Sequence, residues 1–324
     1  MATIVFGQPL AGPSHRVFVS VFLAFVLSAA LVAGTAPIQI SIWAVFLFAG
    51  PHNWMEARYL VSRLPARFGP LRVYFAAGFG GVLALAAAFW ILPWQGFIPP
   101  LWHSGLATWT GALLILRRRE QPGADWFGVL PPICLWLAAA WLAPFTLDIA
   151  IVYAHPLVAF WFLDRQIRRS RPEWLGAWRG CLATIPLLAA TLAWRLALAP
   201  PLEGFDPASW AVIQHTNAAI LQGIPTRLVV GTHAFLETSH YAIWLLALPL
   251  IGLRSAPWQL ENIPLVRHRL GWPRLIRGVL LAGAGAVVLL WFCFWLDYPA
   301  TRQVYFTVAL VHVLAEVPFL VRVS

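Results

Sequence analysis

Apolar runs of similar length, separated by short polar segments, fill this chain from end to end. A helix needs about 20 mostly apolar residues to cross the hydrocarbon core of a bilayer. Stretches near that length occupy residues 16–34, 38–58, 71–92, 99–116, 127–143, 147–164, 179–199, 230–252, 276–296 and 301–321. The pattern predicts an all-α, polytopic integral membrane helical bundle with about ten transmembrane helices. We expect residues 1–324 to form a single transmembrane domain.

Composition agrees with the apolar pattern. Hydrophobic residues make up 60% of the chain and charged residues only 10%, with a mean hydropathy of +0.75. A soluble domain carries roughly 25% charged residues. Because the apolar runs leave no long polar stretch between them, a sizeable soluble domain is excluded.

Arginine supplies the whole positive charge, since the chain has no lysine and a formal net charge of +10. The absence of lysine excludes Schiff-base enzymes and photoreceptors of the usual kind. With ten spans, one set of loops holds Arg63, Arg67, Arg72, Arg117 to Arg119, Arg165 to Arg179, Arg254 to Arg277 and Arg322; the other set holds Arg227 and Arg302, with Arg195 near a span end. The positive-inside rule then predicts that both termini are cytoplasmic. Membrane topology explains these arginines better than nucleic-acid binding does.

The longest predicted external loop covers residues 200–226 and opens with Pro200-Pro201. Its segment 207–222 mixes apolar residues with polar ones and predicts a short helix. We expect this helix to lie at the membrane interface as a lid, or to rest against the bundle.

Five histidines fall inside the predicted spans: His52, His155, His233, His240 and His312. Three of them are followed four residues later by glutamate, which gives the pairs His52/Glu56, His233/Glu237 and His312/Glu316. Polar groups of this kind are costly in a bilayer, and such a residue suggests a functional site. Residues four apart share one helix face. Imidazole and carboxylate are ligands for zinc, copper and non-haem iron.

The third of these segments has the strongest spacing signal. His233, Glu237 and His240 share one face, but seven residues separate the histidines by about 10 Å along a helix axis. Both cannot easily bind one ion. The metal ligands we predict are therefore His52, His155, His240 and His312, with His233 and Glu316 as further candidates. Glu56 and Glu237 are the candidate catalytic carboxylates.

Two segments resemble a known family. Gly50-Pro51-His52-Asn53-Trp54-Met55-Glu56 is similar to the Pro-His-Gly-x-x-Asp pattern of the bacterial Brp/Blh family of membrane β-carotene 15,15'-dioxygenases. His155-Pro-Leu-Val-Ala-Phe-Trp-Phe resembles the family's central His-Pro-Leu-x-Ala-Phe helix. Asn53 and Glu56 replace the family's glycine and aspartate. The histidines that follow the second motif in the family are missing here, where Asp164, Arg165 and Arg168 stand.

The resemblance implies a helical membrane fold and an iron centre that cleaves a carotenoid with O2 near the middle of the membrane. By position it carries over His52 and His155 as ligands and Glu56 as a supporting carboxylate. Together with the spacing, it favours a membrane oxidase or oxygenase that uses Fe(II) and acts on a carotenoid or other isoprenoid in a bacterial inner membrane. The expected partners are a lipophilic small molecule and the bilayer, with no nucleic acid, and the oligomeric state stays open.

Two alternatives belong to other classes. A transporter or channel could use the same histidines and glutamates as a proton or metal-ion pathway. A non-catalytic membrane scaffold could use them only to lock helices together. Symmetry between two halves would favour the transporter, and metal content separates the enzyme from the scaffold.

Overall fold

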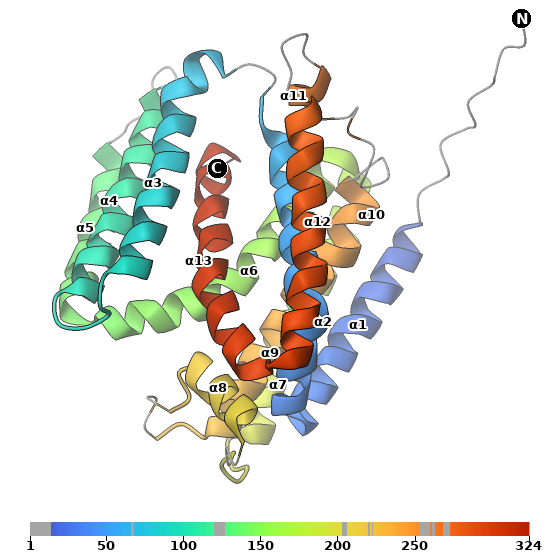
Figure 1. Cartoon of the computed structure of the whole chain (residues 1–324). Coiled ribbons are helices and arrows are strands. Elements are labelled where there is room, and N and C mark those ends of the chain that lie inside the picture. The colour runs from blue at the N-terminus through green and yellow to red at the C-terminus, as the bar shows by residue number, and fades with distance from the viewer. Residues whose placement is uncertain are drawn as a thin grey trace, which may run out of the picture.

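The computed structural model describes residues 14–65, 68–119, 127–202, 206–219, 221, 223–252, 260, 263–267 and 273–323. Regular structure in these residues is helical throughout (Figure 1). The α-helices are α1 His15–Thr35, α2 Pro37–Arg63, α3 Arg72–Ile91, α4 Ile98–Arg119, α5 Leu130–Leu142, α6 Pro144–Ser170, α7 Leu175–Leu196, α8 Pro207–His215, α9 Thr226–Ala242, α10 Leu248–Gly252, α11 Pro264–Arg267, α12 Pro273–Leu296 and α13 Tyr298–Val323.

Helices occupy all ten of the predicted ranges. The predicted fold class, an all-α helical membrane bundle, is confirmed. Seven helical segments of the described chain are long and apolar enough to cross a membrane: His15–Thr35, Gly69–Ile91, Pro144–Ser170, Pro172–Leu196, Thr226–Ile251, Pro273–Leu296 and Tyr298–Arg322. The ten-span count is not confirmed. The segment Phe127–Leu142 is apolar but shorter than the seven. α2 and α4 are long enough, but the first carries Glu56 and Arg58 and the second ends in three arginines.

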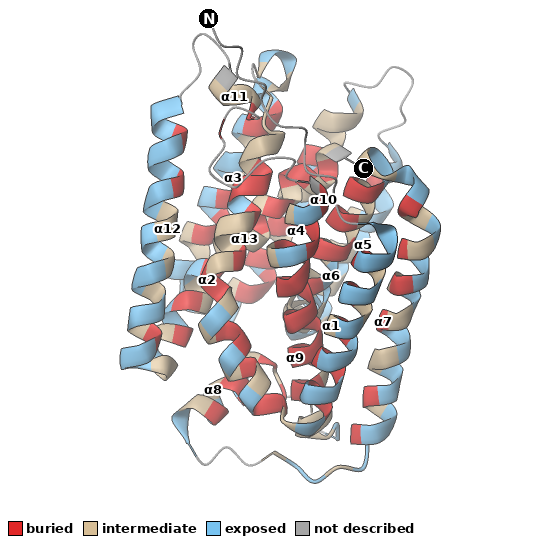
Figure 2. Ribbon diagram, turned by 90° about the vertical axis from the view of Figure 1, so that its right-hand side faces the viewer, coloured by how far each residue is buried: buried red, intermediate tan, exposed pale blue. Residues whose placement is uncertain are grey.

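α9 forms the core of the bundle. In the most apolar stretch of Thr226–Ile251, the segment that contains α9, 72% of the residues are buried, against 11% in that of α12 (Figure 2). It packs against α1, α2, α6 and α7. α3, α4 and α5 form a separate group, which α13 joins to the rest by packing against both α3 and α2 (Figure 1). The polar residues of α9 therefore lie in the core, beside α2 and α6, which carry His52 and His155.

Pro51 shapes the middle of α2. Proline has no N–H, so the carbonyl of Leu47 one turn earlier loses its helical partner. The indole Nε1–H of Trp291 on α12 donates to that carbonyl at 3.2 Å. The hydroxyl of Tyr305 on α13 donates to the carbonyl of Ala49 at 3.3 Å. The first contact satisfies the carbonyl that Pro51 leaves without a helical partner, and both contacts fix the segment that carries His52.

The helix predicted in the 200–226 loop is present as α8, which ends at His215 rather than at 222. Asp206 caps its first turn by accepting from the N–H groups of Ala208 at 3.0 Å and Ser209 at 2.9 Å. The hydroxyl of Ser209 also donates to its carboxylate at 2.5 Å, and this bond, together with those from the backbone, lowers the pKa of the Asp206 carboxyl. α8 rests against α2, α9 and α13, as one of the two expected placements requires. Residues 203–205, 220 and 222 of this loop lie outside the described residues, as do Arg67 and Arg254 of the predicted cytoplasmic loops.

Gly81 lets α3 and α4 approach each other closely. A Cβ built at Gly81 would lie 1.9 Å from the indole nitrogen of Trp109, which is held by a 2.9 Å hydrogen bond to the carbonyl of Ala77. We expect Gly81→Ala to lower the free energy of unfolding by about 1–3 kcal/mol, because the indole must be displaced. Gly80→Ala is the matched control, since its Cβ would meet nothing within 4 Å. Thermal unfolding in detergent should show a lower Tm for the first variant only; equal Tm values would contradict this packing.

Candidate metal centre

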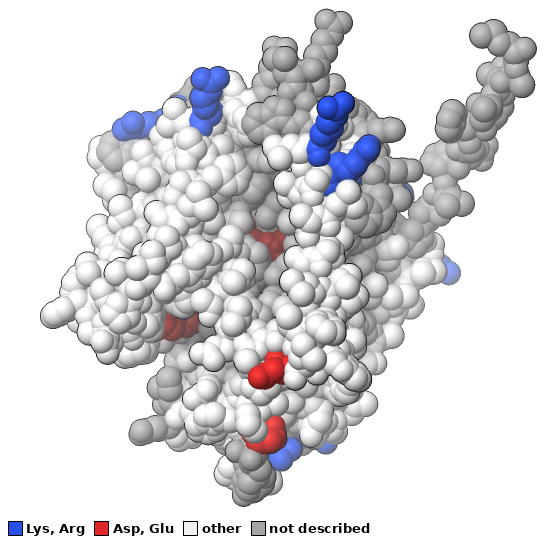
Figure 3. All heavy atoms as spheres, viewed as in Figure 1, with Lys and Arg blue, Asp and Glu red and all other residues white. Residues whose placement is uncertain are grey.

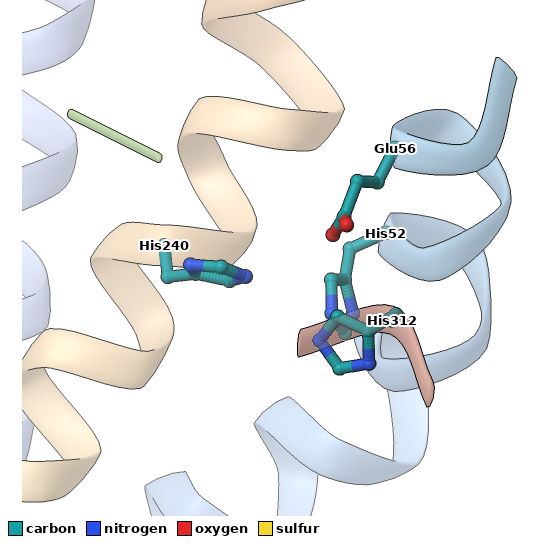
Figure 4. Close-up of side chains that lie close together, drawn as sticks. All are labelled: His52, Glu56, His240 and His312. Carbon is teal, nitrogen blue, oxygen red and sulfur yellow. The ribbon is translucent and has the colours of Figure 1, made fainter. Parts of the chain in front are cut away.

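Four side chains from three helices converge in the core of the bundle. His52 and Glu56 come from α2, His240 from α9 and His312 from α13 (Figure 4). One nitrogen or carboxylate oxygen from each of them lies within 4.8 Å of the corresponding atoms of the other three. His52, Glu56 and His240 are at most 2% exposed. We refer to these four residues as the His/Glu cluster.

Backbone contacts orient two of the imidazoles. Nδ1 of His52 lies 3.0 Å from the carbonyl oxygen of Phe48, so that nitrogen carries the proton and donates it. Nδ1 of His240 lies 3.4 Å from the carbonyl oxygen of Pro156. Both contacts leave Nε2 as the ring nitrogen with a lone pair. Metal-binding histidines commonly donate their second nitrogen in this way, which fixes the tautomer and the ring orientation.

His155 and Glu316 lie next to the cluster. Nε2 of His155 is 3.1 Å from Nε2 of His312, and its Nδ1 is 3.1 Å from Oε2 of Glu316. The imidazole of His155 is centred 4.7 Å from that of His240. Two nitrogens bound at right angles to an ion about 2.1 Å away are separated by about 3 Å. The 3.1 Å between the Nε2 atoms of His155 and His312 therefore also fits two ligands of one ion. Glu316 would then contact the other ring nitrogen of His155, Nδ1.

Several polar atoms of this region are buried without a hydrogen-bond partner in the described structure. They include both carboxylate oxygens of Glu56, Nε2 of His240, Nδ1 of His312 and Oε1 of Glu316. Buried unpaired groups of this kind are costly, and buried charges are normally paired or bound to a metal. A divalent cation would satisfy the lone pairs and balance the carboxylates, so the residues fit a metal site.

His233 lies outside the cluster, in a second polar group nearer α8. Its ring is centred 5.2 Å from that of His215, and its Nδ1 lies 3.9 Å from Oε2 of Glu237. The hydroxyl of Tyr241 donates to Oε1 of Glu237 at 3.0 Å, and the Tyr241 ring is centred 4.4 Å from that of His52. His233 and His240 are seven residues apart on α9, which already places them about two turns from each other. Glu237 connects the two groups, because it contacts His233 on one side and Tyr241, next to His52, on the other.

A cavity of about 310 Å³ adjoins both polar groups. His52, His155, His240 and His312 line one part of it, and His215, His233 and Glu237 line another. The remaining wall is largely apolar and includes Phe89, Ile151, Val152, Leu310 and Val313. Phe89 and Leu310 are only half-buried, and the molecular surface is hollowed between α3 and α12 (Figure 3).

Three cavity residues did not stand out in the sequence. His215 falls in the predicted external loop 200–226, and no short spacing links Tyr241 or Tyr305 to the histidines. Tyr241 lies four residues after Glu237, which puts the two side chains on one helix face, and that spacing is a signal present in the sequence. A π-helical turn, Ile243–Ala247, begins three residues after His240. Such turns are frequent at functional sites.

Comparison with protein-family models, with curated protein sequences and with solved structures finds no match to this chain.

Proposed function

We propose that the chain is a membrane-embedded, metal-dependent oxygenase that acts on a lipophilic substrate. The observation that carries the proposal is the His/Glu cluster, in which His52, Glu56, His240 and His312 converge beside a largely apolar cavity. Histidine and carboxylate ligands with open positions are the donor set of non-haem Fe(II) oxygenases, so Fe(II) is the metal we propose. A bound iron would supply O2 activation.

The protein's own residues would hold and position the reactants. His52, His240 and His312 would bind the ion through nitrogens, and Glu56 would offset its positive charge. Glu316 would keep the His155 ring in place through the 3.1 Å contact at Nδ1. Tyr241 and Glu237 would hold a proton between the phenol oxygen and Oε1, which are 3.0 Å apart. The apolar cavity wall would exclude water from the reacting atoms.

The substrate class follows from the wall of the cavity. Phe89, Ile151 and Leu310 offer no hydrogen bond, so they would bind hydrocarbon rather than a polar molecule. A carotenoid or another isoprenoid fits this chemistry and would reach the cavity from the bilayer. The resemblance of the His52 and His155 segments to membrane β-carotene dioxygenases supports the same choice. In that reaction O2 cleaves one carbon–carbon double bond, and each carbon receives one oxygen atom to give two aldehydes.

The setting we propose is a bacterial inner membrane with both termini cytoplasmic. Seven long apolar helices support an integral membrane protein. α2, α4 and α13 each carry arginine in the last turn, and Figure 3 shows several basic side chains at one end of the molecule. The positive-inside rule favours a cytoplasmic position for that end.

A transporter for protons or metal ions is the second candidate, and one observation favours it. His215, His233, Glu237 and Tyr241 form a run of titratable groups that leads from α8 to His52, with ring or atom separations of 3.0–5.2 Å between successive members. Such runs mark proton relays in membrane proteins. A scaffold is the third reading, and bound metal would argue against it.

The oxygenase reading is tested by expression in a carotenoid-producing host. We expect the colour to fade and two aldehydes to appear by liquid chromatography, while cells that express His52→Ala at the same level keep their carotenoid. Unchanged carotenoid with the metal-loaded protein would overturn the carotenoid substrate. Ion flux through vesicles that contain the protein, without any oxygen consumption, would overturn the oxygenase and favour the transporter.

A further inference from the structure

A second cavity, of about 280 Å³, lies apart from the His/Glu cluster, between the last turns of α2, α6 and α13. Four arginines line it: Arg63, Arg165, Arg169 and Arg322. None of the residues that line this cavity is acidic. We refer to these four residues as the arginine pocket. Four guanidinium groups around one cavity repel one another, and an anion in the cavity would relieve that repulsion.

Gln166 holds one wall of the pocket in place. Its side chain is 6% exposed, and its Oε1 accepts hydrogen bonds from Nη2 of Arg63 and, at 3.3 Å, from the hydroxyl of Tyr59. Its Nε2 donates to Oγ of Ser170 at 3.2 Å. The guanidinium of Arg63 also lies 4.6 Å from the centre of the Tyr59 ring. These contacts fix the guanidinium without neutralising its charge.

Capping of helix ends accounts for only part of this arrangement. Arginines near helix C-termini interact favourably with the last carbonyls, and Nη1 of Arg322 does donate to the carbonyl of Arg63 at 2.9 Å. Arg165 and Arg169 are different. Within the described part of the chain, neither forms an ion pair, whereas Arg168 on the same turn pairs with Asp164 at 2.5 Å. Two arginines that face a cavity and lack an acidic partner indicate a site for an anion.

The anion we infer carries phosphate. Guanidinium groups present paired N–H donors that match the two non-bridging oxygens of a phosphodiester, and several arginines in one cavity suit such an anionic group. Phe162 and Phe319 supply an apolar side to the same cavity. The pocket also stands at the end of membrane-spanning segments, where basic pockets between helices bind lipid head groups. We propose that the arginine pocket binds the phosphate head group of an anionic phospholipid, independently of the metal centre.

The test measures lipid retained by the full chain after extraction from membranes. Protein in nanodiscs of phosphatidylcholine and phosphatidylglycerol is released into detergent, and bound lipid is counted by native mass spectrometry. We expect the wild-type protein to keep phosphatidylglycerol in preference to phosphatidylcholine. The variant R165Q/R169Q should lose that lipid about tenfold or more, because each arginine at a membrane surface contributes to attraction. The matched control is R72Q/R119Q, which removes two exposed arginines at the ends of α3 and α4.

Three results would overturn the proposal. Equal retention of both lipids by the wild-type protein would do so without any variant, which matters if R165Q/R169Q does not fold. Equal loss in R165Q/R169Q and R72Q/R119Q would show general surface attraction instead of a pocket. Inorganic phosphate provides the remaining arm: if it raises the Tm of the wild-type protein while phosphatidylglycerol does not, the site takes free phosphate and not a lipid.

Discussion

Replacing His52 by alanine is expected to remove the bound metal and all turnover while leaving the helical fold in place. His52 is 2% exposed, its Nδ1 is held by the carbonyl of Phe48, and its Nε2 is left for an ion. Loss of a residue that only orients a ligand lowers metal affinity about 10–100-fold. Loss of a ligand should therefore lower it at least ~100-fold. Metal per chain by elemental analysis and helicity by circular dichroism measure the two halves of this result.

Two other histidines serve as controls for that experiment. His15 is exposed at the start of α1, so His15→Ala should keep metal, fold and turnover. His103 is fully buried but pairs with Asp148 at 2.9 Å, away from the His/Glu cluster. His103→Ala should lower stability and still keep the metal. If His103→Ala loses as much metal as His52→Ala at equal folding, the loss reflects general damage to the bundle and the cluster is not the site.

Glu56→Gln should change stability in opposite directions with and without metal. In the metal-free protein both oxygens of Glu56 are buried without a hydrogen-bond partner. An unsatisfied buried group costs about 1–3 kcal/mol, more when charged. The neutral amide should therefore raise the Tm of the metal-free protein. With metal present, the carboxylate of Glu56 is a stronger ligand than the amide of glutamine. The variant should therefore have a lower Tm than the wild-type protein and a lower affinity for the metal.

Thermal unfolding with and without a chelator measures this reversal. A saturating ligand at about 1,000 times its Kd stabilises by about 4 kcal/mol, which is a large shift on the scale of a protein's stability. Glu173→Gln is the control, because Glu173 is exposed in the short turn before α7 and should behave like the wild-type protein in both conditions. A Glu56→Gln protein that is less stable than wild type in both conditions would show that Glu56 has a structural partner and no metal.

The sequence predicted the helices better than the number of spans. Every predicted range is helical because apolar length is a local property that can be read directly from the chain. The count of ten depended on whether polar helices such as α2 cross the membrane, and apolar length does not settle that for a helix with Glu56 and Arg58 in its last turns. α8 was placed correctly at its start, where Asp206 and Pro207 form a cap, but its end at His215 carried no comparable signal.

The residues of the site were recognised by their cost in a bilayer, but their grouping depended on tertiary contacts. The structure brings His52, His240 and His312 together, with His155 beside them, and places His233 with His215 instead. Glu56, a candidate catalytic carboxylate from the sequence, lies within the group of side chains that could hold an ion.

The contact of Tyr305 with the Pro51 segment joins residues 256 apart in sequence. A periodic pattern predicts contacts only between residues a few positions apart in sequence. The cavity and Tyr305 therefore could not be found from spacing alone.

Metal content of the wild-type protein tests the central claim most directly. Purified protein is loaded with Fe(II) without oxygen, freed of unbound ion and examined by elemental analysis and X-ray absorption. The account predicts about one ion per chain with nitrogen and oxygen neighbours at about 2.0–2.2 Å. The variant in which His52, His240 and His312 are all alanine should hold none. A folded wild-type protein that retains no iron, zinc, copper or manganese, or a triple variant that retains as much metal as the wild type, would contradict it.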